Sequence, residues 1–188
     1  MRNMTIILVF FLLFSCGQNN KALKQEYLKK GTEIASLTQK ELLKNVSSAM
    51  KKGGPEYAIE FCSLKALVLK DSLSKLNNCQ IKRISNKYRN PFDMPRTETE
   101  KEQLEKYEQE FSEGKSLQPN VHIFKNEIEY YKPILLAKEA CLKCHGDPGS
   151  HISEGTLAKI KERYPSDLAV GYALDDFRGA WKITFSRK

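Results

Sequence analysis

The sequence predicts an α+β fold in which an antiparallel sheet packs against long N-terminal helices. Two observations predict it: residues 21–52 and 55–76 follow a helical repeat, and strand-like segments with short helical segments between them fill the remainder. A length of 188 residues corresponds to one domain, or one domain with a leader, and excludes a multidomain enzyme. With 40% hydrophobic and 29% charged residues, the composition excludes wholesale disorder and a polytopic membrane protein.

The first 15 residues have the layout of a secretory signal peptide. Arg2 precedes an apolar stretch at residues 6–14, and the small residues Ser15, Cys16 and Gly17 follow it. A membrane-spanning helix needs about 20 apolar residues, roughly twice what this stretch contains. We therefore expect an exported protein without a permanent membrane span.

Residues 13–16 also resemble a bacterial lipoprotein cleavage box, in which Cys16 becomes the acylated first residue. We expect a lipoprotein signal peptide at 1–15, a lipidated N-terminus and linker at 16–22, and a folded domain at 23–188. The mature protein would face the periplasm from the cell envelope, anchored to a membrane by its lipid. An ordinary signal peptide with an incidental Cys16 is the alternative. The net charge of +8 suits an anionic partner, but the basic residues are scattered, and this location argues against nucleic acid.

Two amphipathic helices are expected first in the folded domain. Apolar residues between positions 21 and 52 stay on one face of a 3.6-residue repeat. The turn Gly53-Gly54-Pro55 ends this helix and begins another, because proline suits a first helical turn. The second helix is expected over residues 55–76, with Cys62 on its apolar face.

Shorter elements are expected in the remainder of the chain. Helical repeats predict helices at 98–111, closed by Gly114, and at 156–164. The last two strands are expected to join through residues 175–179. Alternating or apolar segments bounded by turn residues predict strands at 79–85, 122–124, 128–136, 168–174 and 180–185.

One motif carries a strong chemical signal: Cys141-Leu142-Lys143-Cys144-His145. Composition alone predicts about 0.002 occurrences of this spacing. On a turn of helix, two thiols three residues apart can both reach the vinyl groups of a haem, and the next residue places an imidazole under the iron. The motif therefore predicts one covalent haem c, with thioethers to Cys141 and Cys144 and His145 as the proximal iron ligand. A disulfide or redox-active pair, or a zinc site, remains an alternative.

The ligand on the other side of the iron distinguishes the classes of haem protein. Small electron-transfer cytochromes use a methionine after the haem motif, but the methionines here are residues 1, 4, 50 and 94, which excludes that class. Cys62 is a candidate ligand, or else a small core residue. A Cys62–Cys79 disulfide is disfavoured, because an intact helix separates them by up to about 25 Å. The remaining candidates are Cys79, His122, His151, Met50 and Met94.

Four segments together resemble a known family, the Tll-type bacterial single c-type haem domains with a PAS-like fold, catalogued as a domain of unknown function. The resemblance departs at Asp93, where Asn is expected, and at Asp175, where Gly is expected in the last turn. The segments are Gly54–Cys62 with Ala66; Arg83–Ser85 through Arg89–Pro91; Cys141–Gly146; and Tyr164–Gly171 with Arg178–Ala180.

The resemblance implies a PAS-like sheet with helices packed to one side, and an iron ligated by His145 and Cys62. A thiolate ligand favours Fe(III) and a low reduction potential. Departure of Cys62 on reduction would open a site for NO or CO. Arg89 and Arg178 are candidates to pair with the haem propionates, or else each fixes its own loop.

We therefore expect a sensor of redox state or of a diatomic gas, which would need a separate signalling partner because the chain carries no signalling module. An electron-transfer cytochrome is the alternative. An enzyme is not expected, because no catalytic acid–base pair is visible in the sequence.

Overall fold

The structure is a computed structural model that describes the backbone of residues 7–187 and the side chains of residues 20–63 and 68–187. Residues 1–6 of the predicted signal peptide lie outside the described residues. The side chains of the whole signal peptide and of Cys16 are not described either. No helix in the described part is long and apolar enough to cross a membrane. The elements are α1 (Ile7–Leu76), β1 (Gln80–Ile84), the 3-10 turn η1 (Pro91–Asp93), α2 (Glu98–Ser112), β2 (Asn120–Ile123), β3 (Glu127–Leu135), α3 (Glu139–His145), α4 (Glu154–Arg163) and β4 (Phe177–Ser186).

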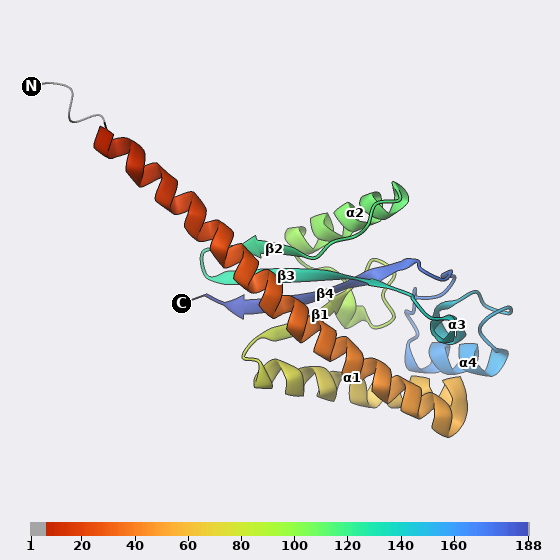
Figure 1. The fold of residues 1–188 in the computed structure, drawn as a ribbon. Coiled ribbons are helices and arrows are strands. Elements are labelled where there is room, and N and C mark those ends of the chain that lie inside the picture. Colours follow the sequence, from red (N-terminus) through yellow and green to blue (C-terminus); the bar gives the residue numbers. More distant parts are fainter. Residues whose placement is uncertain (1–6, 188) are drawn as a thin grey trace, which may run out of the picture.

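Helix α1 consists of two limbs joined by a sharp turn, as the sequence predicts. Gly53 and Gly54 leave helical geometry, and Gly54 has φ +71°, a conformation that glycine adopts without strain. Pro55 then lies at the start of the second limb. Figure 1 shows the second limb folding back beside the first, so that residues 55–76 run antiparallel to the end of residues 7–52.

The four strands form one antiparallel sheet in the order β1-β4-β3-β2. Tyr130 pairs with Ile183 and Tyr131 with Lys182 across β3 and β4. Successive side chains of a strand point to opposite faces, so Tyr130 faces α1 and Tyr131 faces α2. The core between α1 and the sheet is built on Ile34, Ala35, Leu73, Ile81, Val121, Ile128, Tyr130, Trp181, Ile183 and Phe185.

The expectation that the helices pack on one side of the sheet is wrong. Leu104 and Tyr107 of α2 are buried against Ile84, Tyr131 and Ala180 on the face opposite α1. Helix α2 is therefore amphipathic with one buried stripe, and it covers the second face of the sheet over part of its length (Figure 1). The sheet is thus buried on both faces where α1 and α2 overlap.

The strand predicted at residues 168–174 does not form. Its backbone groups bond elsewhere: the N–H of Leu168 donates to Tyr88, and the N–H groups of Gly171 and Tyr172 donate to the end of α3. The last strand also begins earlier than predicted, at Phe177 rather than residue 180. Asp175 has φ +64°, the left-handed conformation in which glycine is expected and which aspartate tolerates.

Candidate functional site

The two thiols of the Cys141–His145 motif lie one turn apart on the short helix α3. Both are half-buried free thiols. Cys144 packs against the apolar cluster of Ile59, Ile152 and Ile160, which joins α3 to α1 and α4. Residues three apart on a helix share a face, so both sulfurs are presented on one side of α3.

His145 is fixed in one tautomer. Its Nδ1 lies 2.8 Å from the carbonyl oxygen of Ala169, and because a carbonyl can only accept, Nδ1 carries the proton. Burial lowers the pKa of His145 well below its usual range, and the Arg89 and Arg178 guanidinium groups lower it further. The neutral ring therefore keeps a lone pair on Nε2, the form in which histidine binds metals.

The segment between α4 and β4 clamps the end of α3. The N–H of Gly171 donates to the Gly146 carbonyl at 2.8 Å, and the N–H of Tyr172 donates to the His145 carbonyl at 3.0 Å. The Tyr172 ring meets the imidazole edge-on, with centroids 6.3 Å apart. This segment therefore sets the orientation of the His145 ring through both backbone and side-chain contacts.

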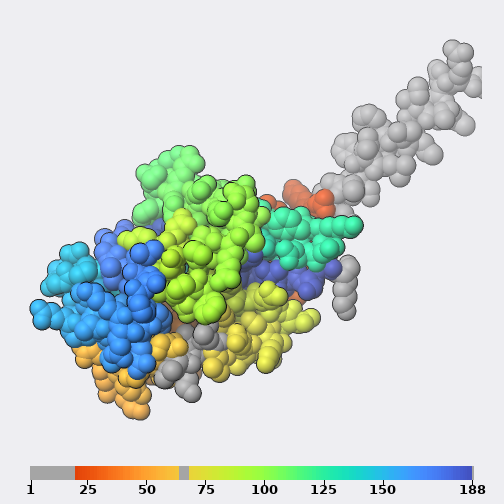
Figure 2. Space-filling view, turned by 180° about the vertical axis from the view of Figure 1, so that it is seen from behind, coloured from red at the N-terminus to blue at the C-terminus, as the bar shows by residue number. Residues whose placement is uncertain are grey.

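Arg89 ties the motif to this clamping segment. Its Nη2 donates to the carbonyl oxygens of Cys144 at 2.5 Å and Ala169 at 3.1 Å, while its Nε donates to Asp167 at 3.0 Å. The Arg89–Asp167 ion pair is buried on both sides, with 8% and 7% of the side chains exposed. Figure 2 shows the chain around residue 90 (lime green) beside the chain around residue 165 (blue).

Cys62, on the second limb of α1, lies close to the motif. Burial raises the pKa of Cys144 to about 11, Arg89 opposes this, and Cys62 and Cys141 add to the rise. Burial likewise raises the pKa of the Cys62 thiol, against the opposing charges of Arg83 and Arg89. The fold thus places the second limb of α1, with Cys62, beside Cys144 of α3.

A cavity of about 380 Å³ opens beside Cys62, between the two limbs of α1. Its lining is mostly apolar. The thiol of Cys62 therefore borders a space that admits small uncharged molecules and is unsuited to ions. The other residues of its lining are Leu42, Asn45, Val46, Phe61, Val68, Leu69 and Ser72.

The two arginines named as candidate propionate partners differ in their surroundings. Arg89 has its Nε and Nη2 engaged, which supports the alternative role of fixing a loop. Arg178 is only 3% exposed; its Nη1 donates to Ser85 at 2.9 Å, while its Nε and Nη2 have no partner among the described residues. Burial lowers the pKa of Arg178 to about 10. A propionate contact stays a prediction for both residues.

The other candidate ligands lie away from α3 or face other partners. His122 is on β2, where its Nε2 bonds to Gln103 at 2.9 Å, at the end of the sheet remote from α3 (Figure 1). His151 is exposed and its Nδ1 accepts a hydrogen bond from the N–H of Asp147.

The sulfur-bearing candidates also lie at other places. Met94 is 42% exposed, and Cys79 packs at the edge of the α1–sheet core. Met50 is half-buried near the end of the first limb.

Sequence reasoning did not assign roles to Asp167, Tyr172 or Arg83. Asp167 holds Arg89, Tyr172 contacts His145, and Arg83 forms an ion pair with Asp93 at 2.9 Å while facing Cys62. Asp167 and Arg83 belong to segments that carry the family resemblance, and this resemblance is the only signal in the sequence that points to them. Each of these roles depends on contacts between segments far apart in the chain, which no local spacing reveals.

A model of the Tll0287-like family matches residues 18–186, nearly the whole chain. The chain belongs to the Tll0287-like family. A solved structure described as the cyanobacterial heme-protein Tll0287 is similar to it, with a TM-score of 0.66 at 24% identity. The match covers 87% of this chain and 96% of that one, so this member of the Tll0287-like family shares the fold of Tll0287 over the whole α+β domain. No curated protein matches the chain.

Proposed function

We propose that this protein is an exported c-type haem protein that senses redox state or a diatomic gas. Cys141 and Cys144 would form the thioethers, His145 would ligate the iron through Nε2, and Cys62 would ligate it from the other side. The observation that carries the proposal is that Cys62 lies near Cys144 of the motif, whose neighbour His145 has its Nδ1 bonded to Ala169. The description of the solved relative Tll0287 as a heme-protein supports it.

The residues present fit such a group. The donor set combines two thiols at thioether spacing, a neutral imidazole with a free Nε2 and a third thiol near the pair. Zinc fits less well, because no three His, Cys, Asp or Glu side chains within the described residues converge as a metal cluster. A bound haem would supply an iron that changes oxidation state and takes up small gaseous ligands.

The surroundings of Cys62 favour a ligand that can be exchanged. Burial opposes ionisation of the thiol, whereas Arg83 and Arg89 favour the thiolate, so the balance between the bound thiolate and the free thiol is sensitive to charge at the iron. The apolar cavity gives a released Cys62 side chain space to move, and it would admit a neutral gas beside Cys62. We therefore expect Cys62 to bind in the ferric state and to leave on reduction.

Export and anchoring are part of the proposal. Covalent haem attachment takes place outside the bacterial cytoplasm, which agrees with a signal peptide at residues 1–15 and acylation of Cys16. The lipid would hold the domain at the membrane surface, where a separate signalling or redox partner would read its state. An electron-transfer cytochrome is the second candidate; it would keep both ligands in both oxidation states.

Absorbance spectra of the purified protein test the ligand assignment. We expect Cys62→Ala to alter the ferric spectrum and Cys79→Ala, the matched control, to leave it unchanged. Reduced wild-type protein should change its spectrum when NO or CO is added. A ferric spectrum that Cys62→Ala leaves unchanged would remove the thiolate ligand, and a reduced protein indifferent to both gases would favour the electron carrier.

A further inference from the structure

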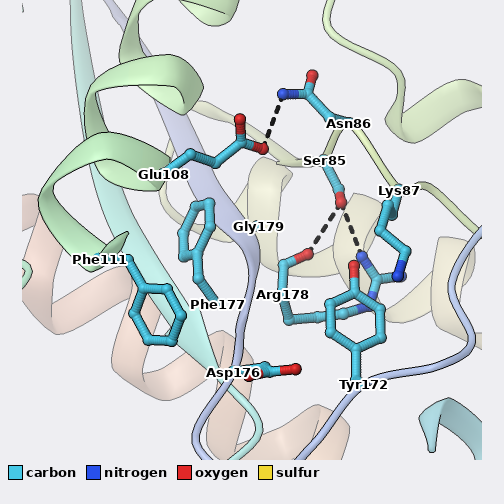
Figure 3. Close-up of a pocket in the computed structure, with 10 residues that line it drawn as sticks. All are labelled: Ser85, Asn86, Lys87, Glu108, Phe111, Tyr172, Asp176, Phe177, Arg178 and Gly179. Carbon is cyan, nitrogen blue, oxygen red and sulfur yellow. Dashed lines mark hydrogen bonds between the residues drawn. The ribbon is translucent and has the colours of Figure 1, made fainter. Parts of the chain in front are cut away.

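A second pocket lies beside the candidate haem site, where the start of β4 meets the ends of β1 and α2. Its volume is about 260 Å³, just below the usual range of ligand sites, which suits a small molecule. Figure 3 shows Arg178 reaching across the pocket toward Ser85, with the Tyr172 ring and the Lys87 chain beside it. Phe111 and Phe177 form an apolar wall on the α2 side.

Arg178 is a buried cation of this pocket, and no carboxylate of the described residues forms an ion pair with it. Two nearby arginines each have one: Arg83 pairs with Asp93 at 2.9 Å and Arg89 with Asp167 at 3.0 Å. Arg178 instead has one hydrogen bond from Nη1 to the Ser85 hydroxyl, and its Nε and Nη2 are buried without a partner in the described part of the chain. An unpaired buried guanidinium is costly, so an anion is expected there.

The acidic residues of the pocket do not supply that anion. Glu108 accepts a hydrogen bond from Asn86 at 2.9 Å, and Asp176 accepts one from the N–H of Ala173 at 2.7 Å. Figure 3 shows the Glu108 carboxylate turned toward Asn86 and away from the Arg178 guanidinium. Lys87 adds a second cation, with its Nζ 4.2 Å from the centre of the Tyr172 ring.

We propose that this pocket is a carboxylate site whose anchor is the Nε–Nη2 edge of Arg178. That edge matches the two oxygens of a carboxylate, with Lys87 at the rim and the two phenylalanines against a short carbon chain. The centre of the Tyr172 ring lies 5.5 Å from Cζ of Arg178, and the same ring contacts His145. An occupant that displaces the Tyr172 ring would therefore change the surroundings of the candidate iron ligand. The carboxylate belongs either to a small organic acid or to a haem propionate. The proposal that a haem propionate occupies the site rests on the proposed function.

Calorimetric titration of the purified full-length protein with acetate, propanoate and pyruvate tests the free-acid form. Propanamide, which has the same shape without the charge, is the ligand control. We expect saturable binding of the acids alone, weakened about 10- to 100-fold by Arg178→Gln because a bidentate charged pair is lost. Arg187→Gln, a substitution of an exposed arginine that bonds to the Phe124 carbonyl away from the pocket, should leave acid binding unchanged.

The reduction potential of the haem separates the two sources of carboxylate. If a propionate occupies Arg178, added acids will not bind, but Arg178→Gln will lower the midpoint potential more than Arg187→Gln, because a cation near the iron favours reduction. Absence of both effects overturns the proposal. If Arg178→Gln does not fold, Lys87→Gln and Phe111→Ala replace it as test variants. The proposal is then overturned if neither variant changes acid binding or the midpoint potential of the haem. A colourless protein that still binds acid through Arg178 would refute the haem while retaining the site.

Discussion

The Nη2 atom of Arg89 donates a 2.5 Å hydrogen bond to the carbonyl oxygen of Cys144, the residue immediately before His145. The same nitrogen also donates to the Ala169 carbonyl, which accepts the Nδ1 proton of His145. Arg89 therefore touches both the backbone that carries the imidazole and the group that orients it. Asp167 holds the arginine in place from within the clamping segment.

Loss of Arg89 should destabilise the protein strongly. Arg89→Met leaves Asp167 as an unpaired buried carboxylate and removes two carbonyl contacts, which should lower the free energy of unfolding by about 3–5 kcal/mol. Arg89→Lys, which keeps the charge but loses the fork, should fall between this variant and wild type. Urea unfolding measures the difference. Arg163→Met breaks the half-exposed pair with Glu60 and should cost no more than about 1 kcal/mol; equal losses in the two methionine variants would refute the anchoring role.

Gly31 marks the closest approach of α1 to the sheet. A Cβ at this position would lie 2.2 Å from Cγ of Tyr130, a fully buried ring. Gly31→Ala gains up to about 1 kcal/mol of helix propensity, but overpacking costs about 1–3 kcal/mol, so net destabilisation is expected. Thermal unfolding tests it against Gly155→Ala, where the Cβ meets the flexible carboxylate end of Glu56 and can displace it. A stabilised Gly31→Ala would show that the helix does not pack this closely.

A buried ion cluster under α2 should make stability depend on pH. Lys182 contacts Glu100 at 3.1 Å and also pairs with Glu129. Burial alone would raise the pKa of Glu100, but hydrogen bonds from the Arg96 backbone, Lys182 and Lys82 outweigh it and lower the pKa below its usual value.

Because the folded-state pKa of Glu100 is depressed, its contribution to stability is present above the pKa of the unfolded chain, near 4.5, and is lost as the pH falls through the folded-state value. Lys182→Met removes the cation and should lower the free energy of unfolding by about 3–5 kcal/mol at pH 7, with a smaller loss at pH 3. Urea unfolding across this pH range measures both. A loss that is the same at the two pH values would contradict the assignment.

The turn at Gly53-Gly54-Pro55 and the position of Cys62 on a helix could be predicted from the sequence, because helix ends and amphipathic faces are local patterns. The motif Cys141–His145 can be recognised in the same way, because its five residues are consecutive in the sequence. The sequence of the clamping segment predicts a strand, because its apolar residues alternate, whereas its backbone N–H groups bond to Tyr88 and to the end of α3.

The partners of Arg89 and Arg178 could not be predicted in the same way. Arg89 and Asp167 lie 78 residues apart, and no spacing rule connects them. The sequence also does not reveal that α2 covers the second face of the sheet, because charged residues dominate this helix and only Leu104 and Tyr107 form its buried apolar stripe.

Covalent attachment of haem is tested most directly by intact mass and absorbance of the purified protein after export in a strain that matures c-type cytochromes. The wild-type chain should exceed the mass of its polypeptide by one haem and keep its colour after denaturation, because two thioethers hold the group. The Cys141→Ala, Cys144→Ala double variant should lose both properties. A colourless wild-type protein with the mass of the bare polypeptide would contradict the proposed function.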